Sequence, residues 1–280
     1  MSSPVEIAHP LSKYIRKGAQ PHTHCSGCGN GIIAQSFLRA VDEVGLPKQK
    51  LVCVAGIGCS GWIPSPFFDI DTLHATHGRP IAFATGVKLG NPDLEVVVFA
   101  GDGDVSAIGG NHLIHAARRN IGIKVICVNN MIYGMTGGEV APTTPRGMKT
   151  TTTPFGNLER PFDLSKLVIA AGGTYVARWT TYHVARLVAS MKNALTRNGF
   201  AFLEVVSQCP VHYGRRIGIT NPVEMMRWFQ KQSITTERAR EMTEQELLGK
   251  FVVGEFVNIE VPELTKLYAD LFEAAIRGSN

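Results

Sequence analysis

The sequence lacks the features that mark several classes of protein. No hydrophobic run among its 280 residues is long enough to cross a bilayer. The first 20 residues contain no apolar core of a secretory signal. No segment is repeated or low in complexity, and positive charge occurs in short pairs such as Arg118-Arg119 rather than in the clustered stripe of a nucleic-acid binder. We therefore expect a cytoplasmic globular protein with neither a membrane span nor a nucleic-acid partner.

The most informative motif present is Gly101-Asp102-Gly103, which residues 104–128 separate from Asn129-Asn130. An apolar run precedes each half, at 96–100 and at 123–128, and each run is typical of a buried parallel strand. The stretch through 111–119 is suited to a helix. Strand, turn, helix and strand would place both halves at the carboxyl ends of neighbouring strands, where open α/β sheets bind ligands.

The residue types at this edge predict one divalent metal ion and one diphosphate. A carboxylate from Asp102 and an amide oxygen from Asn130 are hard ligands that suit Mg²⁺. Glycine on both sides of Asp102 allows backbone to approach a ligand closely. The alternative is an ordinary α/β turn followed by a chance pair of asparagines, and the spacing favours the metal site.

Strand and helix patterns alternate along most of the chain, which predicts one doubly wound parallel sheet in an α/β fold. Residues 1–221 would form this domain, with a loop at 139–161 whose length suggests a function. Residues 222–280 are more charged and read as a mostly helical C-terminal arm that packs on the domain or on a partner. The remaining helices are expected at 30–44, 80–89, 162–171, 182–196 and 262–276, and the remaining strands at 51–55, 174–177 and 201–206.

Several separate motifs, in order over about residues 20–220, resemble one family. The paired motif resembles that of thiamin diphosphate enzymes, and its surroundings are similar to the β subunit of 2-oxoacid:ferredoxin oxidoreductases. The matching stretches are HTHCSGCGNG at 22–31, GIGC at 56–59, HGR at 77–79 with GVK at 86–88, NNMIYGMTGG at 129–138, and PTTP at 142–145. The resemblance implies a thiamin diphosphate-binding fold.

The resemblance also implies roles for individual residues. Asp102 and Asn130 would bind Mg²⁺ through their side chains, and Ile132 through its carbonyl oxygen. The cofactor would contact Gly101, Gly103, Asp104, Tyr133 and Thr136, with backbone amides near Gly103 and Asp104 around the diphosphate. His77 would reach cofactor or substrate as a catalytic residue, or else form hydrogen bonds within its own turn.

The six cysteines divide into two groups. Cys53 and Cys127 lie in apolar strands and are expected to be small core residues. The other four lie in turns beside Gly, Ser or Pro: Cys25, Cys28, Cys59 and Cys209. Four thiolates suit zinc or an iron–sulfur cluster, and unrelated surface cysteines are the alternative. The resemblance implies that all four bind one 4Fe–4S cluster. Since no ferredoxin-type C-x-x-C-x-x-C-x-x-x-C-P run occurs, electrons would leave to a separate carrier.

The reaction implied is the oxidative decarboxylation of a 2-oxoacid with coenzyme A and ferredoxin, in either direction. Residues 132–138 are most similar to members that use 2-oxoglutarate, giving succinyl-CoA and CO₂. Gly137 stands where some broad-specificity relatives have lysine, which leaves Arg146, Lys149 or a partner to bind the distal carboxylate. The alternatives are pyruvate or a branched 2-oxoacid as substrate, a non-redox thiamin diphosphate decarboxylase or synthase, and a zinc-bound assembly module.

The family takes its activating glutamate from another subunit, and no residue in this sequence is an obvious replacement. The resemblance therefore implies a partner, an α or fused α/γ subunit, that completes the active site. Ferredoxin and the 2-oxoacid are the other expected partners. The net charge of +5 either steers an acidic electron carrier to the protein or reflects ordinary solvated surface.

Overall fold

The apolar runs of the sequence form the centre of one eight-stranded sheet. The computed structural model describes residues 9–278. Residues 1–8 of the expected domain and residues 279–280 of the expected C-terminal arm lie outside the described part. The strand order is β2-β1-β3-β4-β6-β5-β8-β7, and the first six of these are parallel. The bounds are β1 Leu51–Ala55, β2 Asp71–His74, β3 Glu95–Gly101, β4 Ile123–Asn129, β5 Tyr175–Thr180, β6 Ala201–Val206, β7 Ser233–Thr235 and β8 Phe251–Asn258.

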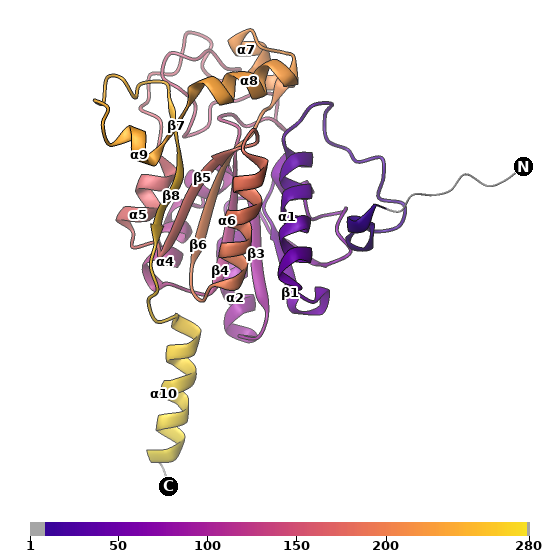
Figure 1. The fold of residues 1–280 in the computed structure, drawn as a ribbon, viewed down its shortest axis with the longest axis vertical. Helices are drawn as coiled ribbons and strands as arrows, with labels where there is room; N and C mark the ends of the chain where they lie inside the picture. The colour runs from indigo at the N-terminus through magenta and orange to yellow at the C-terminus, as the bar shows by residue number, and fades with distance from the viewer. Residues whose placement is uncertain (1–8, 279–280) are drawn as a thin grey trace, which may run out of the picture.

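Helices cover both faces of this sheet, as the alternating pattern predicts (Figure 1). Helices α1 and α6 lie on one face, while α2, α4 and α5 lie on the other. The bounds are α1 Asn30–Val44, α2 Pro80–Gly90, α3 Asp102–Ser106, α4 Gly110–Arg119, α5 Leu164–Ala170, α6 Val184–Thr196, α7 Arg215–Ile217, α8 Pro222–Gln232, α9 Thr236–Ala239 and α10 Leu264–Gly278. Short turns of 3₁₀ helix include η3 Cys59–Trp62, and a π turn, η4, spans Pro210–Gly214.

A hydrophobic core fills the space between the sheet and each helical layer. Phe37 of α1 and Phe99 of β3 are fully buried, and their rings meet edge to face with centroids 4.9 Å apart. Truncating either ring to Ala would cost about 3–5 kcal/mol. Cys53 and Cys127 are also fully buried, one in each core, which confirms the expectation that they are core residues.

The register of the central strands brings the two halves of the paired motif together. Strand β3 pairs with β4 so that Gly101 lies opposite Val128. Asp102 therefore follows β3 at the same edge of the sheet where Asn129 ends β4 and Asn130 follows it. The sheet places these residues side by side, as their positions after two parallel strands predict.

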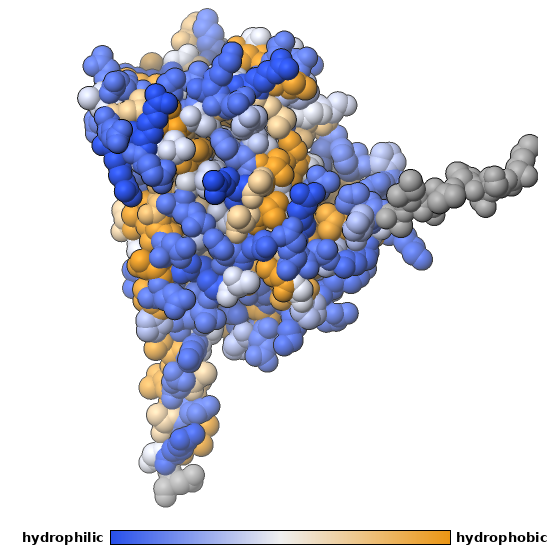
Figure 2. All heavy atoms as spheres, viewed as in Figure 1, coloured by the Kyte–Doolittle hydropathy of each residue, from blue (hydrophilic) through white to orange (hydrophobic). Residues whose placement is uncertain are grey.

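The C-terminal region contains strands that the sequence did not predict. The expected helix at 262–276 is present as α10, and α8 and α9 are helical too. However, β8 pairs antiparallel with β5 and carries β7 on its outer side. The region thus extends the sheet of the domain, while α10 points away from it with apolar side chains along its length (Figure 1, Figure 2). A domain boundary at 221/222 stays a prediction.

Between β4 and α5 the chain forms a long loop without helix or strand, as expected for 139–161. It is nevertheless held by its own hydrogen bonds, such as that from the Gly147 amide to the Asn157 carbonyl at 2.7 Å. Within residues 9–278, no helix has both the length and the apolar character of a membrane span.

Candidate functional site

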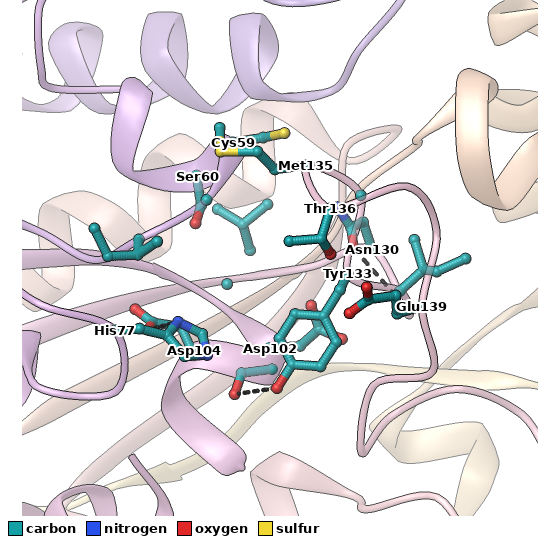
Figure 3. Close-up of a pocket in the computed structure, with 17 residues that line it drawn as sticks. Cys59, Ser60, His77, Asp102, Asp104, Asn130, Tyr133, Met135, Thr136 and Glu139 are labelled. Atoms are coloured by element: carbon teal, nitrogen blue, oxygen red, sulfur yellow. Dashed lines mark hydrogen bonds and ion pairs between the residues drawn. The ribbon is translucent and has the colours of Figure 1, made fainter. Parts of the chain in front are cut away.

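A cavity of about 260 Å³ opens at the carboxyl ends of β1, β3 and β4 (Figure 3). All the residues predicted to contact the cofactor line it: Gly101, Asp102, Gly103, Asp104, Asn130, Ile132, Tyr133 and Thr136. His77 and Cys59 line it as well. Sequence reasoning missed Ile57, Ser60, Met135 and Glu139, which also face the cavity. Their positions in turns next to the recognised motifs were the only signal that the sequence offered.

Asp102 is a buried charged group of the cavity, with 2% of the residue exposed. It is the first residue of α3, so the amides of the following residues lie in the first helical turn, where helical partners are absent. Burial raises the pKa of Asp102 to about 7, although the Thr143 hydroxyl donates a hydrogen bond to the carboxylate. A carboxylate that burial disfavours in this way fits a divalent cation, which would hold it ionised.

The loop after β4 has a conformation fixed by its own polar groups. Met131 adopts a positive φ of 62°, which is uncommon for a residue other than glycine. The Thr144 hydroxyl donates to the Met131 carbonyl at 2.7 Å, and the Ile132 amide donates to Asn130 Oδ1 at 3.2 Å. Asn130 and Ile132, on either side of Met131, both line the cavity that Asp102 also lines.

Tyr133 closes the cavity over the helix that begins at Asp102. Its hydroxyl donates to the Gly103 carbonyl at 3.0 Å. A Cβ atom at Gly103 would lie only 2.3 Å from the Tyr133 ring, so glycine is needed for this close approach. Burial, followed by the Asp102 and Asp104 carboxylates, raises the pKa of Tyr133 to about 12. The phenol is therefore a permanent donor at neutral pH.

His77 and Asp104 form a pair on another wall of the cavity (Figure 3). His77 Nδ1 lies 2.7 Å from Asp104 Oδ1, and the Gly78 amide donates to the same oxygen at 2.6 Å. A Cβ atom at Gly56 would lie 1.8 Å from Asp104 Oδ2, so the carboxylate occupies space that only glycine leaves. Burial raises the pKa of Asp104, and the Gly78 amide and His77 partly offset this effect.

The four turn cysteines are brought near one another from three segments of the chain. The Gly29 amide donates to the Gln208 carbonyl at 3.0 Å, and Asn30 Nδ2 donates to the Cys59 carbonyl at 2.9 Å. These bonds join the turn of Cys25 and Cys28 to the turns of Cys209 and Cys59. Burial, together with a smaller contribution from the neighbouring thiols of Cys209, Cys59 and Cys25, raises the pKa of Cys28 to about 12.

No single-ion site is formed by three or more His, Cys, Asp or Glu side chains anywhere in residues 9–278. Of the three expected Mg²⁺ ligands, only Asp102 has a side chain of these types. The other two are the side-chain amide of Asn130 and the backbone carbonyl of Ile132. The four thiols are neighbours without converging on one point. A single tetrahedral ion needs such convergence, whereas in a four-iron cluster each cysteine binds a different iron.

Comparisons with known proteins agree with this geometry. Residues 56–205 match the family model described as thiamine pyrophosphate enzyme, C-terminal TPP binding domain. The chain is 54% identical over 265 residues to the 2-oxoglutarate synthase subunit KorB of Methanocaldococcus jannaschii, covering 95% of this chain and 98% of that protein. It is 40% identical over 209 residues to a 2-oxoacid:ferredoxin oxidoreductase subunit beta from Sulfolobus sp, covering 74% of this chain and 66% of that one.

The chain belongs to the β subunits of the 2-oxoacid:ferredoxin oxidoreductases. Among solved structures it is similar to a 2-oxoglutarate:ferredoxin oxidoreductase from Magnetococcus marinus with 2-oxoglutarate, coenzyme A and succinyl-CoA bound. The TM-score is 0.84 at 30% identity, with 96% of this chain and 91% of that chain covered. The expected family and fold are confirmed.

Within this β subunit, the residues suggested for a distal substrate carboxylate do not line the cavity. Arg146 and Lys149 are exposed on the long loop. Arg216, which sequence reasoning missed, contacts the residue before Glu139 of the cavity wall: its Nη2 donates to the Gly138 carbonyl at 2.9 Å. The only signal in the sequence was its position in a basic pair soon after Cys209.

Proposed function

We propose that this chain is the thiamin diphosphate-binding subunit of an enzyme that oxidises 2-oxoglutarate with coenzyme A and passes the electrons to ferredoxin. The observation that carries the proposal is the buried Asp102 facing Asn130 in a cavity at the carboxyl ends of β3 and β4. The names of several relatives support 2-oxoglutarate as the substrate. The products would be succinyl-CoA and CO₂, and the reaction would be reversible.

Mg²⁺ would be held by Asp102 and Asn130 through their side chains and by Ile132 through its carbonyl oxygen. The amides of Gly103 and Asp104 would contact the diphosphate, and Tyr133 and Thr136 would line the space for the rest of the cofactor. When bound, thiamin diphosphate supplies the electron sink that decarboxylation of a 2-oxoacid requires. The protein supplies orientation, and its apolar wall residues Ile57 and Met135 would exclude water.

His77 would hold and transfer a proton at Nε2. Its Nδ1 is turned toward Asp104, which fixes the ring and leaves Nε2 as the nitrogen available to the cavity. A structural role within the turn is the alternative, because the Gly78 amide also uses Asp104 as its acceptor. Exchange of His77 for a residue that cannot transfer protons distinguishes the two roles.

One 4Fe–4S cluster would be held by Cys25, Cys28, Cys59 and Cys209. Their turns are joined by hydrogen bonds, and Cys59 also lines the cavity. The cluster would thus lie next to the cofactor and accept its electrons. None of the six cysteines forms a disulfide in the described residues, so the four turn cysteines are available as ligands.

A second subunit would complete the active site. Apolar side chains are exposed on the cavity wall and on the long loop beyond it, including Met135 at 49%, Phe155 at 97% and Leu158 at 83%. Contiguous exposed apolar surface marks interaction sites. We assign it to the α or fused α/γ subunit that would bring the activating glutamate. Glu139 of this chain lines the cavity. It is therefore the residue to test as an activating glutamate in place of the one expected from the partner.

The test is anaerobic purification of the chain with its partner, followed by quantification of iron, sulfide, magnesium and thiamin diphosphate. We expect one four-iron cluster, one magnesium ion and one cofactor for each copy of this chain. Zinc without iron or cofactor would instead identify an assembly module, and cofactor without iron would identify a non-redox enzyme. Rates with a panel of 2-oxoacids then decide the substrate.

A further inference from the structure

The first asparagine of the Asn129-Asn130 pair points away from the cavity. Val128 and Asn130 line the cavity, and successive residues of a strand face opposite sides of the sheet. Asn129 is buried on the side of α5, where its Nδ2 donates to Glu204 Oε1 at 2.8 Å. Its Oδ1 accepts the Met131 amide at 3.1 Å. Asn129 therefore connects the protein interior to the turn that carries the magnesium-binding groups.

Glu204 is a carboxylate inside the sheet, with 3% of its surface exposed. Its second oxygen accepts hydrogen bonds from Arg178 Nε at 2.8 Å and from Ser165 Oγ at 2.7 Å. Arg178 also forms an ion pair with Asp163, the residue that caps α5. Partners from β4, β5 and α5 thus fix Glu204 from three directions, which makes it a rigid anchor for Asn129.

The turn that this anchor supports is one that would not form by itself. Met131 has φ 62°, and a non-glycine residue keeps this conformation only where its surroundings impose it. Asn129 Oδ1 holds the amide of Met131, and the Thr144 hydroxyl holds its carbonyl. Met131 separates Asn130 from Ile132, so its conformation decides whether the two groups can face the same ion.

We infer that Glu204, acting through Asn129, is a positioning residue for the magnesium-binding turn, an inference that rests on the proposed function. Neither side chain contacts the ion. Groups that orient metal ligands from behind typically change metal affinity by about 10- to 100-fold when they are replaced. We expect a loss of this size in Glu204→Gln, because glutamine cannot accept from Asn129, Arg178 and Ser165 together.

The chain offers a matched control at the opposite end of the same sheet. Glu95 of β3 lies 3.5 Å from Lys124 Nζ, and the lysine side chain is only 3% exposed. Lys124 also donates to the carbonyls of Arg197 and Gly199 at 2.8 and 2.9 Å. In Glu95→Gln, Lys124 keeps its two carbonyl acceptors. In Glu204→Gln, the Arg178 guanidinium likewise keeps its ion pair with Asp163. Both variants remove one charge that is largely shielded from solvent, but only one of these charges supports the turn.

The experiment uses the full chain assembled with its partner subunit. Calorimetry measures Mg²⁺ affinity at saturating thiamin diphosphate, and hydrogen exchange of the metal-free complex follows the peptide containing Met131. We expect about 10- to 100-fold weaker Mg²⁺ binding and faster exchange in Glu204→Gln, with both values unchanged in Glu95→Gln. Asn129→Ala, which leaves the Glu204–Arg178 pair intact, should reproduce the loss and serves if Glu204→Gln does not fold.

Each other outcome contradicts a defined part of the argument. Unchanged Mg²⁺ affinity and exchange in Glu204→Gln or Asn129→Ala would overturn the positioning role while leaving the proposed function intact. An equal loss in Glu95→Gln would also overturn it, because the effect would then follow from general destabilisation. A wild-type complex that binds no Mg²⁺ with thiamin diphosphate would overturn the proposed function and this inference together.

Discussion

His77 Nδ1 lies 2.7 Å from Asp104 Oδ1, although His77 belongs to a turn and Asp104 to helix α3. The buried carboxylate also accepts the amide of Gly78, so it fixes both the ring and the backbone beside it. A histidine held in this way keeps its ring in a constant orientation, with Nε2 as the nitrogen that is not turned toward Asp104.

We predict that His77→Gln lowers kcat of the complex by about 100-fold or more, because general acid–base groups contribute about 10²- to 10⁴-fold. Thiamin diphosphate affinity should not change, since His77 is no ligand of Mg²⁺. His74→Gln is the control, because His74 is exposed and does not line the cavity. Full activity in His77→Gln would instead show that His77 has only a structural role.

Asp102 gives the metal-free chain a predictable dependence on pH. Its pKa of about 7 in the fold lies above the ordinary value of 3.8, so the folded chain binds this proton more tightly than the unfolded chain. The resulting stability is present below about pH 4 and is lost as the pH rises through 7. Between pH 6 and 8 we expect Tm to fall more in the wild type than in Asp102→Asn.

The same ionisation should make cofactor binding stronger at higher pH. Mg²⁺ replaces the proton on Asp102, so binding releases protons, and Mg²⁺ with thiamin diphosphate should raise Tm more at pH 8 than at pH 6. Calorimetry in two buffers of different ionisation enthalpy measures the protons released. Proton release that persists undiminished in Asp102→Asn would show that another group is responsible.

Gly103 tests the close approach of Tyr133. A Cβ atom here would lie 2.3 Å from the ring, so Gly103→Ala should displace Tyr133 and weaken cofactor binding at least tenfold. Gly110→Ala is the matched control, because no atom lies within 4 Å of the position of its Cβ. Alanine there should stabilise α4 by up to about 1 kcal/mol. Equal cofactor affinity in both variants would exclude the steric argument.

The sequence predicted the buried strands and the edge of the sheet that forms the site, because both depend on local pattern. Runs such as 96–100 and, apart from Lys124, 123–128 are apolar on both faces, and only a parallel strand between two helical layers needs this. It did not predict β2, since Asp71–His74 is a mostly exposed edge strand, nor β8, whose strand character depends on pairing with β5.

Long-range pairing also explains which parts of the site were missed. The motifs identified Asp102 and Asn130, but not the Asp104–His77 pair or the contact of Asn129 with Glu204. Glu204 lies in an apolar strand far along the chain, and only the register of β6 beside β4 brings it to Asn129. Residues whose role depends on such packing carry no local signal.

The cysteines make a prediction that separates ligands from core residues. Cys25→Ser, Cys28→Ser, Cys59→Ser and Cys209→Ser should each reduce iron content and alter the EPR spectrum of the reduced protein. Cys53→Ser and Cys127→Ser should keep the cluster and only lower Tm, because these side chains are fully buried. Full iron content with an unchanged spectrum in any of the first four would exclude that cysteine as a ligand.

The last prediction concerns the shared active site. We expect no turnover from the isolated chain with any 2-oxoacid, and ferredoxin reduction once the partner subunit is added. The complex should prefer 2-oxoglutarate with coenzyme A over pyruvate, and it should lose activity in air as its cluster is oxidised. Ferredoxin reduction should slow as salt is added if the net charge of +5 steers an acidic carrier.

A substitution at Glu139 tests whether the partner is needed for catalysis or only for assembly. Glu139→Gln keeps the size of the side chain that lines the cavity but removes its charge. If the activating glutamate comes from the partner, the complex carrying Glu139→Gln should keep kcat within about threefold, because a group outside the proton-transfer path adds little to the barrier. A loss of two orders of magnitude, together with turnover by the isolated wild-type chain, would place the activating group in this chain. If the complex turned over pyruvate faster than 2-oxoglutarate, the proposal of a shared active site would still hold and only the assigned substrate would change.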